Sequence, residues 1–137
     1  MNKDRNLLIL IVLAFLGYSM FATGKAFLDQ GKFLTVNEAK KRWGQKPFIA
    51  QAFKDGSAKD RAPMVYELIL KKEFVGKTAS EVKAQLGPTS GYFWSEKVPT
   101  YLIEEGWAEN KDTWQVVFLI DEKERVKEVR IHKNCCD

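Results

Sequence analysis

The side chains best suited to chemistry lie together at the C-terminus of the sequence. Among 137 residues there is a single histidine and there are two cysteines, namely His132, Cys135 and Cys136, followed by the terminal Asp137. An imidazole, two thiolates and a carboxylate could together hold Zn²⁺ or Cu(I). A structural zinc site, however, requires a complete tetrahedral ligand set on a rigid frame, whereas this cluster ends the chain. His132, Cys135 and Cys136 are therefore candidates for a metal or thiol-redox site, with a plain tail as the alternative, and we expect no bound cofactor.

The adjacency of the two cysteines restricts the disulfides that they can form. A trans peptide sets neighbouring Cα atoms about 3.8 Å apart, whereas a disulfide usually sets them about 4.4–6.8 Å apart. The sequence contains no third cysteine, so an ordinary internal disulfide is excluded. In an oxidising compartment, Cys135 and Cys136 would form either a strained vicinal disulfide or a bridge between two chains, which makes a cysteine-linked homodimer one alternative.

The remaining polar residues show no catalytic pattern. Glu104 and Glu105 are adjacent, so on a strand they point to opposite faces and cannot act on the same substrate atom. The sequence contains no nucleophile with a plausible base, no glycine-rich phosphate loop and no metal-binding pair at helical spacing. We therefore expect a protein that is not an enzyme.

Aromatic side chains in the second half of the chain are candidates for contact with a partner. Trp107 lies in a polar loop between two glutamates, and a tryptophan in a loop is a common anchor in interfaces. It could equally fold back as a lid over the sheet. The candidate interaction residues are Tyr92, Phe93, Trp94 and Trp107.

Two capping boxes define the expected helices most clearly. Thr35 with Glu38, and Thr78 with Glu81, have the spacing at which each side chain bonds the backbone N–H of the other residue. The second helix should end at Gly87, because glycine accepts the left-handed C-terminal position and the following proline prevents continuation. The expected helices cover residues 35–43, 48–53, 63–73 and 78–86.

Beyond Pro88 the hydrophobic period changes to two, which predicts strands. Apolar residues on both faces of the segment 113–120 indicate a central strand. On the last strand, Val129 and Ile131 should face the core and His132 should face outward. Residues 92–94 are a short strand candidate, and the main strands cover 100–104, 113–120 and 126–133. Helices followed by a three-stranded antiparallel meander define an α+β fold.

The N-terminal segment indicates export or membrane attachment. Residues 7–22 carry no charge and follow Lys3 and Arg5, which favours an N-terminus inside and a domain outside the cytoplasm. Two interpretations remain, an uncleaved signal anchor that inserts residues 7–22 in the membrane, and a cleaved signal peptide. We thus expect an anchor or signal over 1–23, a linker over 24–34 and one α+β domain over 35–137.

The charge distribution argues against nucleic acid as a partner. The formal net charge is +4, and the basic residues are dispersed along the chain. A nucleic-acid-binding protein would show a basic stripe with interleaved aromatic residues, and no such stripe is visible.

From Phe74 onward the chain resembles the SmpA/OmlA family, the BamE-like envelope domain. The resemblance rests on Gly76-Lys77-Thr78, Glu81-Val82, Leu86-Gly87-Pro88, Tyr101, Trp114 to Phe118 and Val126. It implies helices packed on a three-stranded antiparallel sheet, in a domain known for binding and not for catalysis. This chain departs from the family in an extra helical stretch over 35–70 and in lacking the lipid-attachment cysteine.

The resemblance also implies a place and a role. We expect a non-catalytic, extracytoplasmic protein-binding or scaffold module of the bacterial cell envelope, whose partner is an unidentified envelope protein. It would be held in the inner membrane with a periplasmic domain, or secreted to the periplasm after cleavage. Two alternatives are an inhibitor or immunity-type protein that blocks an envelope enzyme, and a metal- or thiol-redox protein that uses His132, Cys135 and Cys136.

Overall fold

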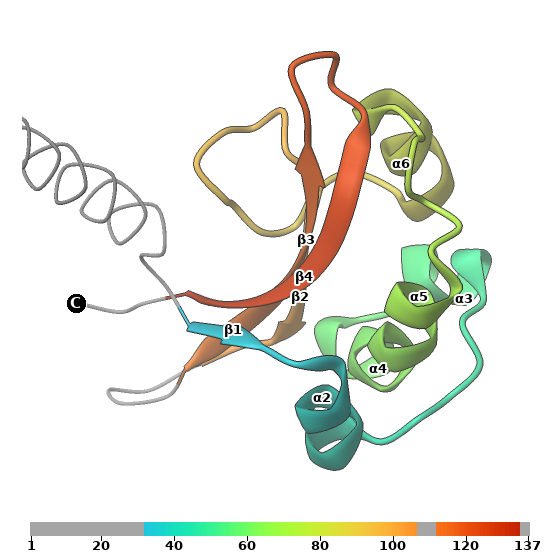
Figure 1. Cartoon of the computed structure of the whole chain (residues 1–137). Helices are drawn as coiled ribbons and strands as arrows, with labels where there is room; N and C mark the ends of the chain where they lie inside the picture. The colour runs from blue at the N-terminus through green and yellow to red at the C-terminus, as the bar shows by residue number, and fades with distance from the viewer. Residues whose placement is uncertain (1–31, 107–111, 135–137) are drawn as a thin grey trace, which may run out of the picture. The chain divides into compact units, whose positions relative to one another are not determined.

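The computed structural model describes residues 32–106 and 112–134, which form an α+β unit with helices on one side of an antiparallel sheet (Figure 1). The expected signal or anchor over residues 1–23, Trp107, Cys135 and Cys136 all lie outside the described residues. No helix within the described ranges has the length and apolar character needed to cross a membrane.

The helices α2 (Val36–Trp43) and α6 (Ala79–Leu86) begin and end where the sequence signals predict, whereas the helix predicted over 48–53 lies at 50–55 and the one predicted over 63–73 starts as a 3₁₀ turn and ends at Lys71. Before α2, the Thr35 hydroxyl accepts a hydrogen bond from the Glu38 N–H, and the Glu38 carboxylate accepts one from the Thr35 N–H. Thr78 and Glu81 make the same pair of bonds before α6, so both capping boxes are formed. Gly44 and Gly87, directly after these helices, have φ angles of 84° and 86°, which glycine adopts without a Cβ clash. The helical segments are α2 (Val36–Trp43), α3 (Ala50–Asp55), α4 (Ala58–Arg61), the 3₁₀ turn η1 (Ala62–Met64), α5 (Val65–Lys71) and α6 (Ala79–Leu86).

The sheet has four strands, so the predicted three-stranded meander is wrong in strand number. The spatial order is β1-β4-β3-β2, with every neighbouring pair antiparallel. The additional strand pairs Phe33 with His132 and comes from the segment 24–34 that was expected to be a linker. A strand of three residues is too short for its alternation to stand out in the sequence. The strands are β1 (Lys32–Leu34), β2 (Thr100–Glu104), β3 (Thr113–Ile120) and β4 (Val126–Asn134).

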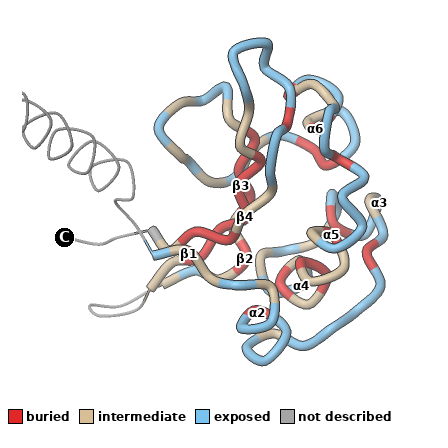
Figure 2. The backbone as a smooth tube through the Cα atoms, in the orientation of Figure 1, coloured by how far each residue is buried: buried red, intermediate tan, exposed pale blue. Residues whose placement is uncertain are grey.

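One face of the sheet and the helices share a core that is rich in aromatic rings. Phe48, Phe53, Tyr101, Phe118 and Phe74 contact one another in a closed circuit of edge-to-face pairs, with centroid distances from 5.5 to 5.9 Å. Figure 2 shows the buried positions concentrated along β2, β3 and β4 and in the helices that pack on them. The extra helical stretch is therefore part of the same core as the sheet.

Candidate functional site

The loop between α6 and β2 covers the sheet face that the helices leave open. Val116 points into the helical core, so its neighbours Gln115 and Val117 point to the opposite face. Both are nevertheless fully buried, and His132, paired across the strands with Gln115, is only 6% exposed. Residues 88–99, which we call the aromatic loop, cover Gln115 and, together with Phe33, His132.

Hydrogen bonds fix the aromatic loop to the edge of β2. The backbone N–H groups of Ser90 and Gly91 both donate to the carbonyl of Thr100 at 3.0 Å. The Thr100 N–H donates to the Thr89 hydroxyl at 3.0 Å, and the Leu102 N–H donates to the Ser90 hydroxyl at 3.0 Å. The loop therefore acts as a partial edge for β2 and satisfies backbone groups that the sheet leaves unpaired.

A buried glutamine clamps the loop above the middle of the sheet. The Gln115 side-chain amide donates to the Tyr92 carbonyl at 2.8 Å, and its oxygen accepts from the Tyr92 N–H at 3.2 Å. Gly91 is required at this crossing, because a Cβ there would lie 2.5 Å from the Gln115 Oε1 and 2.9 Å from the Thr100 Cγ2.

The predicted strand over residues 92–94 is wrong, because this crossing breaks the extended backbone. Only an isolated bridge between Phe93 and Ser95 remains, and Trp94 has a φ of 60°. That angle lies in the left-handed region, where a bulky side chain is rare and strained.

The left-handed turn divides the three consecutive aromatic residues between two roles. Phe93 turns inward and packs on His132, with ring centroids 4.8 Å apart, and on Phe33 at 6.4 Å. Tyr92 and Trp94 point outward, with 58% and 66% of their surfaces exposed. The Tyr92 hydroxyl donates to the Trp94 carbonyl at 3.0 Å, which holds the two residues together.

His132 occupies a different environment from the one predicted. The alternation of side chains along β4 places His132 on the sheet face opposite the helices, as predicted. The aromatic loop and Phe33 bury it there, whereas the sequence predicted that it would face outward. Its Nδ1 is 3.3 Å from the Gln115 Nε2. Within residues 32–106 and 112–134, no three His, Cys, Asp or Glu side chains approach closely enough to hold a metal ion.

The charged groups near the sheet edge form a second, separate cluster. Arg42 contacts Glu104 through two hydrogen bonds, of 2.6 and 3.1 Å, and the Trp43 indole N–H donates to the same carboxylate at 2.5 Å. The Arg42 hydrogen bonds, aided by that from Trp43, hold the pKa of Glu104 below its usual range. Glu105 follows it as an exposed residue, so the two adjacent carboxylates do not form a paired site.

The sequence predicted Tyr92, Phe93 and Trp94 as interaction residues; the structure exposes Tyr92 and Trp94 but turns Phe93 inward, and the sequence did not reveal the groups that position them. Gln115, Gly91 and Phe33 carry no motif, and their roles depend on contacts across the sheet. Gln115 was the one available signal, because it is a polar residue within the strongly apolar strand β3. A buried side-chain amide needs hydrogen-bond partners, so its presence there indicates a segment that crosses the sheet. No family model, curated protein or solved structure matches the chain.

Proposed function

We propose that this protein is a non-catalytic binding module that presents Tyr92 and Trp94 to a protein partner. The proposal rests on the exposed rings of Tyr92 and Trp94, which lie on a loop that the Gln115 side chain hydrogen-bonds to the sheet. Tyrosine and tryptophan are enriched at interface hot spots, because they bury a large area at a low cost in side-chain entropy. A rigid support reduces the ordering cost of binding further.

The backbone at Trp94 supports the same proposal. A glycine would relieve the left-handed conformation, with its φ of 60°, that the tryptophan maintains. A strained residue persists where its side chain has a use, and an exposed indole contributes little to the packing of the fold. Contact with a partner gives this side chain a reason to be present.

The shifted carboxyl groups of the described residues serve the fold. Where a carboxyl pKa is shifted in residues 32–106 and 112–134, it is lowered, as at Glu81 and Asp60 by hydrogen bonds from their helix caps and at Glu104 by Arg42. These hydrogen bonds favour the ionised form of each carboxyl group, which stabilises the helix caps and the contact of Glu104 with Arg42.

The cellular location that we propose rests on the N-terminal sequence. The charge-free segment 7–22 after Lys3 and Arg5 supports an extracytoplasmic domain of the bacterial envelope, with an inner-membrane anchor or a cleaved signal. The resemblance of the segment from Phe74 onward to the SmpA/OmlA family supports a protein partner in that envelope. Neither an inhibitor role nor a metal or redox role is favoured by an observation on the described residues.

Site-specific photo-cross-linking tests the proposal. The photoreactive residue p-benzoylphenylalanine would replace Trp94 in one full-length variant and Ile49, which is 58% exposed beside α3, in a matched control. After irradiation of envelope membranes, we expect a discrete cross-linked protein from position 94 that is absent from position 49. Products of equal yield at both positions, or none at position 94, would refute the proposal.

The variant Trp94→Gly separates binding from stability. Its free energy of unfolding should stay within about 1 kcal/mol of the wild-type value, since relief of the backbone strain offsets the lost ring contact with Phe93. The same variant should lose most of its partner in quantitative co-purification. Full retention of the partner in a folded Trp94→Gly protein would show that the indole is not the contact.

A further inference from the structure

The outer edge of β4 is covered at both ends but open in the middle. β1 pairs only with residues 131–133. At the other end, Gly76 donates to the Val126 carbonyl and Val126 donates to the Lys77 carbonyl, both at 2.8 Å. No strand lies beside Lys127–Arg130 on this side within the part of the chain that the structure describes. Alternate residues of this stretch therefore present N–H and C=O groups to an empty edge, which is a template for another strand.

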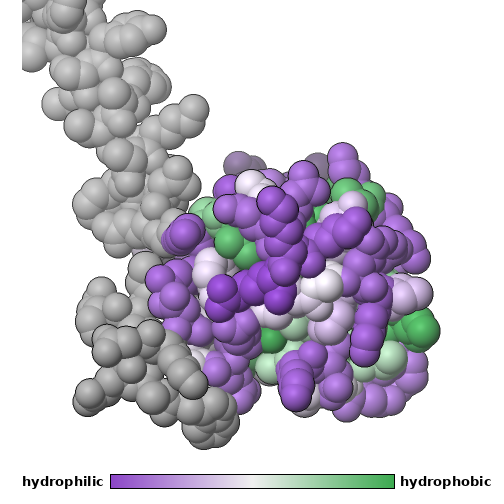
Figure 3. Space-filling view, turned by 90° about the horizontal axis from the view of Figure 1, so that it is seen from below, coloured by the Kyte–Doolittle hydropathy of each residue, from purple (hydrophilic) through white to green (hydrophobic). Residues whose placement is uncertain are grey.

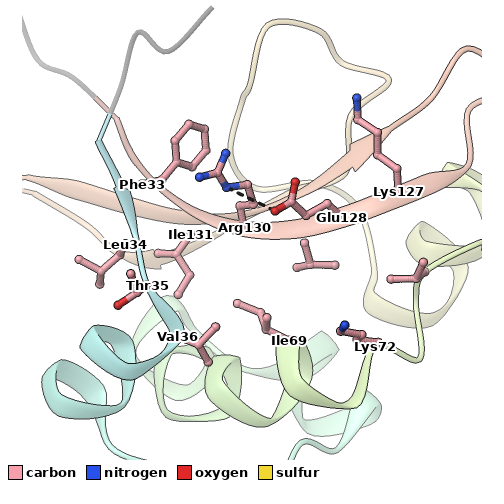
Figure 4. A pocket seen from close by; sticks show the side chains of 12 residues that line it. Phe33, Leu34, Thr35, Val36, Ile69, Lys72, Lys127, Glu128, Arg130 and Ile131 are labelled. Atoms are coloured by element: carbon pink, nitrogen blue, oxygen red, sulfur yellow. Dashed lines mark ion pairs between the residues drawn. The ribbon is translucent and has the colours of Figure 1, made fainter.

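A hollow with an apolar floor lies directly beside the open edge (Figure 4). Its volume is about 500 Å³, and β4, β1, the start of α2 and the end of α5 enclose it. The side chains of Val36, Ile69, Val129 and Ile131 form the floor, and each of the first three is only partly buried. We call this hollow the β4 groove. A strand added to the edge would direct every second side chain into it.

The rim of the β4 groove is basic. Lys72, Lys127 and Arg130 line it, opposed by a single acidic residue, Glu128, whose carboxylate is 3.7 Å from the Arg130 guanidinium. The Phe33 ring holds Arg130 in place, with the guanidinium carbon 3.7 Å from the ring centroid. The rim thus retains an excess of positive charge that would attract an acidic segment.

Lys72 supplies one of the positive charges beside the β4 groove. Lys72 ends α5 with a φ of 51°, in the left-handed conformation that glycine or asparagine normally supplies at this position. A lysine here interacts favourably with the helix dipole, and it also places a positive charge beside the β4 groove.

We propose that the open edge of β4 binds an extended peptide segment of a partner protein as an additional strand, with apolar side chains alternating with acidic ones. The apolar side chains fill the β4 groove beside Lys72, and the acidic ones, on the other face of the added strand, meet Lys127 and Arg130 (Figure 4). Backbone hydrogen bonds to residues 127–130 supply affinity, and the alternation supplies specificity. This surface is separate from Tyr92 and Trp94 and does not depend on the function proposed for them.

A designed peptide tests the proposal on the full-length protein. The probe is a fluorescein-labelled nonapeptide that alternates valine with glutamate, and the control peptide carries lysine in place of glutamate. We expect binding of the acidic peptide, measured by fluorescence polarisation, and slower amide hydrogen exchange at residues 127–130. Methylation of alternate peptide nitrogens should abolish this binding. Absence of binding, or binding that survives methylation, would overturn strand addition.

Charge-reversed variants assign the binding to the β4 groove. The double variant Lys127→Glu/Arg130→Glu should weaken binding of the acidic peptide about tenfold or more. Lys46→Glu/Lys59→Glu changes the net charge equally at two exposed positions outside the groove and should retain the wild-type affinity. An equal loss in both variants would reduce the effect to net charge and refute the assignment, as would exchange protection confined to the aromatic loop. Trp94→Gly should bind the peptide unchanged, so failure here is distinguishable from failure of the aromatic contact.

Discussion

Tyr101 shows how a single polar group is accommodated in an aromatic core. Its ring is fully buried between Phe53 and Phe118, and its hydroxyl donates to the Gly87 carbonyl at 2.8 Å. Burial raises the pKa of this hydroxyl from 10.0 to about 12, because the charged phenolate is poorly solvated there. The residue therefore joins the end of α6 to β2 through its neutral form.

Tyr101→Phe should lower the free energy of unfolding by about 1–2 kcal/mol, because it leaves the Gly87 carbonyl without its buried donor. A group with a raised folded-state pKa contributes stability that is present below its unfolded-state value and is lost as the pH rises. Wild-type stability should thus fall between pH 10 and about 12, and part of that fall should vanish in the variant. Urea unfolding at stepped alkaline pH measures both effects, and Tyr66→Phe, which keeps Tyr101, should retain the wild-type slope.

Among the elements, two helices with the same kind of cap differ in how they are attached. α6 buries Ala79, Val82 and Leu86, whereas α2 buries only Ala39. Both begin with a threonine–glutamate capping box, so their local signals are nearly identical. α6 should therefore unfold with the core, while α2 can open locally at a smaller cost.

Removing each cap should expose this difference. Thr78→Ala should lower the global free energy of unfolding by about 1 kcal/mol, since α6 cannot open without the core. Thr35→Ala should change the global value less and should instead accelerate amide hydrogen exchange within residues 36–43. Denaturant unfolding and native-state exchange on both variants provide the comparison, and equal global losses would show that α2 is bound as firmly as α6.

Across the whole molecule, the aromatic circuit joins parts of the chain that are distant in sequence. Phe48 and Phe53 come from the region of α3, Phe74 follows α5, and Tyr101 and Phe118 come from the sheet. Because each ring contacts two others, the helices and the sheet should unfold in one cooperative transition. Figure 3 shows that one outer face of the molecule is mostly hydrophilic, with small separated apolar patches, in contrast to this interior.

A double-mutant cycle tests the circuit. Phe74→Leu and Phe118→Leu should each cost about 1–3 kcal/mol. Their combined effect should depart from additivity by about 0.5–1.5 kcal/mol, because the two rings are in edge-to-face contact at 5.5 Å. Phe74→Leu with Phe93→Leu, on the opposite face of the sheet, should be additive within about 0.5 kcal/mol. Additivity for Phe74 and Phe118 would show that the ring contact contributes nothing beyond burial.

The parts of the fold that the sequence predicted are those with local signals. The capping boxes of α2 and α6 and the alternation of β3 lie within a few residues of the elements that they define. α4 was missed although Ser57 and Asp60 form a third capping box, because the helix is a single turn without an apolar stripe. Strand β1 was missed because its pairing partner lies about a hundred residues away in the sequence.

The candidate site was predictable only in part, for a related reason. Consecutive aromatic residues at 92–94 indicated a contact surface or a strand, and periodicity alone does not distinguish exposed rings from buried ones. The division of roles between Phe93 and Trp94 follows from the Gln115 clamp and the left-handed turn. Both depend on the loop crossing the sheet at Gly91, which is a tertiary contact.

The pairing of Lys32 with Lys133 places the first described residue beside the next-to-last one at one end of the β1–β4 ladder. A force that pulls Lys32 and Lys133 apart would separate β1 from β4 one residue pair at a time. The hydrogen bonds between the two strands lie along the direction of this force, so they are loaded in sequence and not all at once. Once the last pair, Leu34 with Ile131, has opened, the free edge of β4 would run without interruption from Lys127 to Lys133, so tension on the chain would enlarge the surface on which an incoming strand can dock.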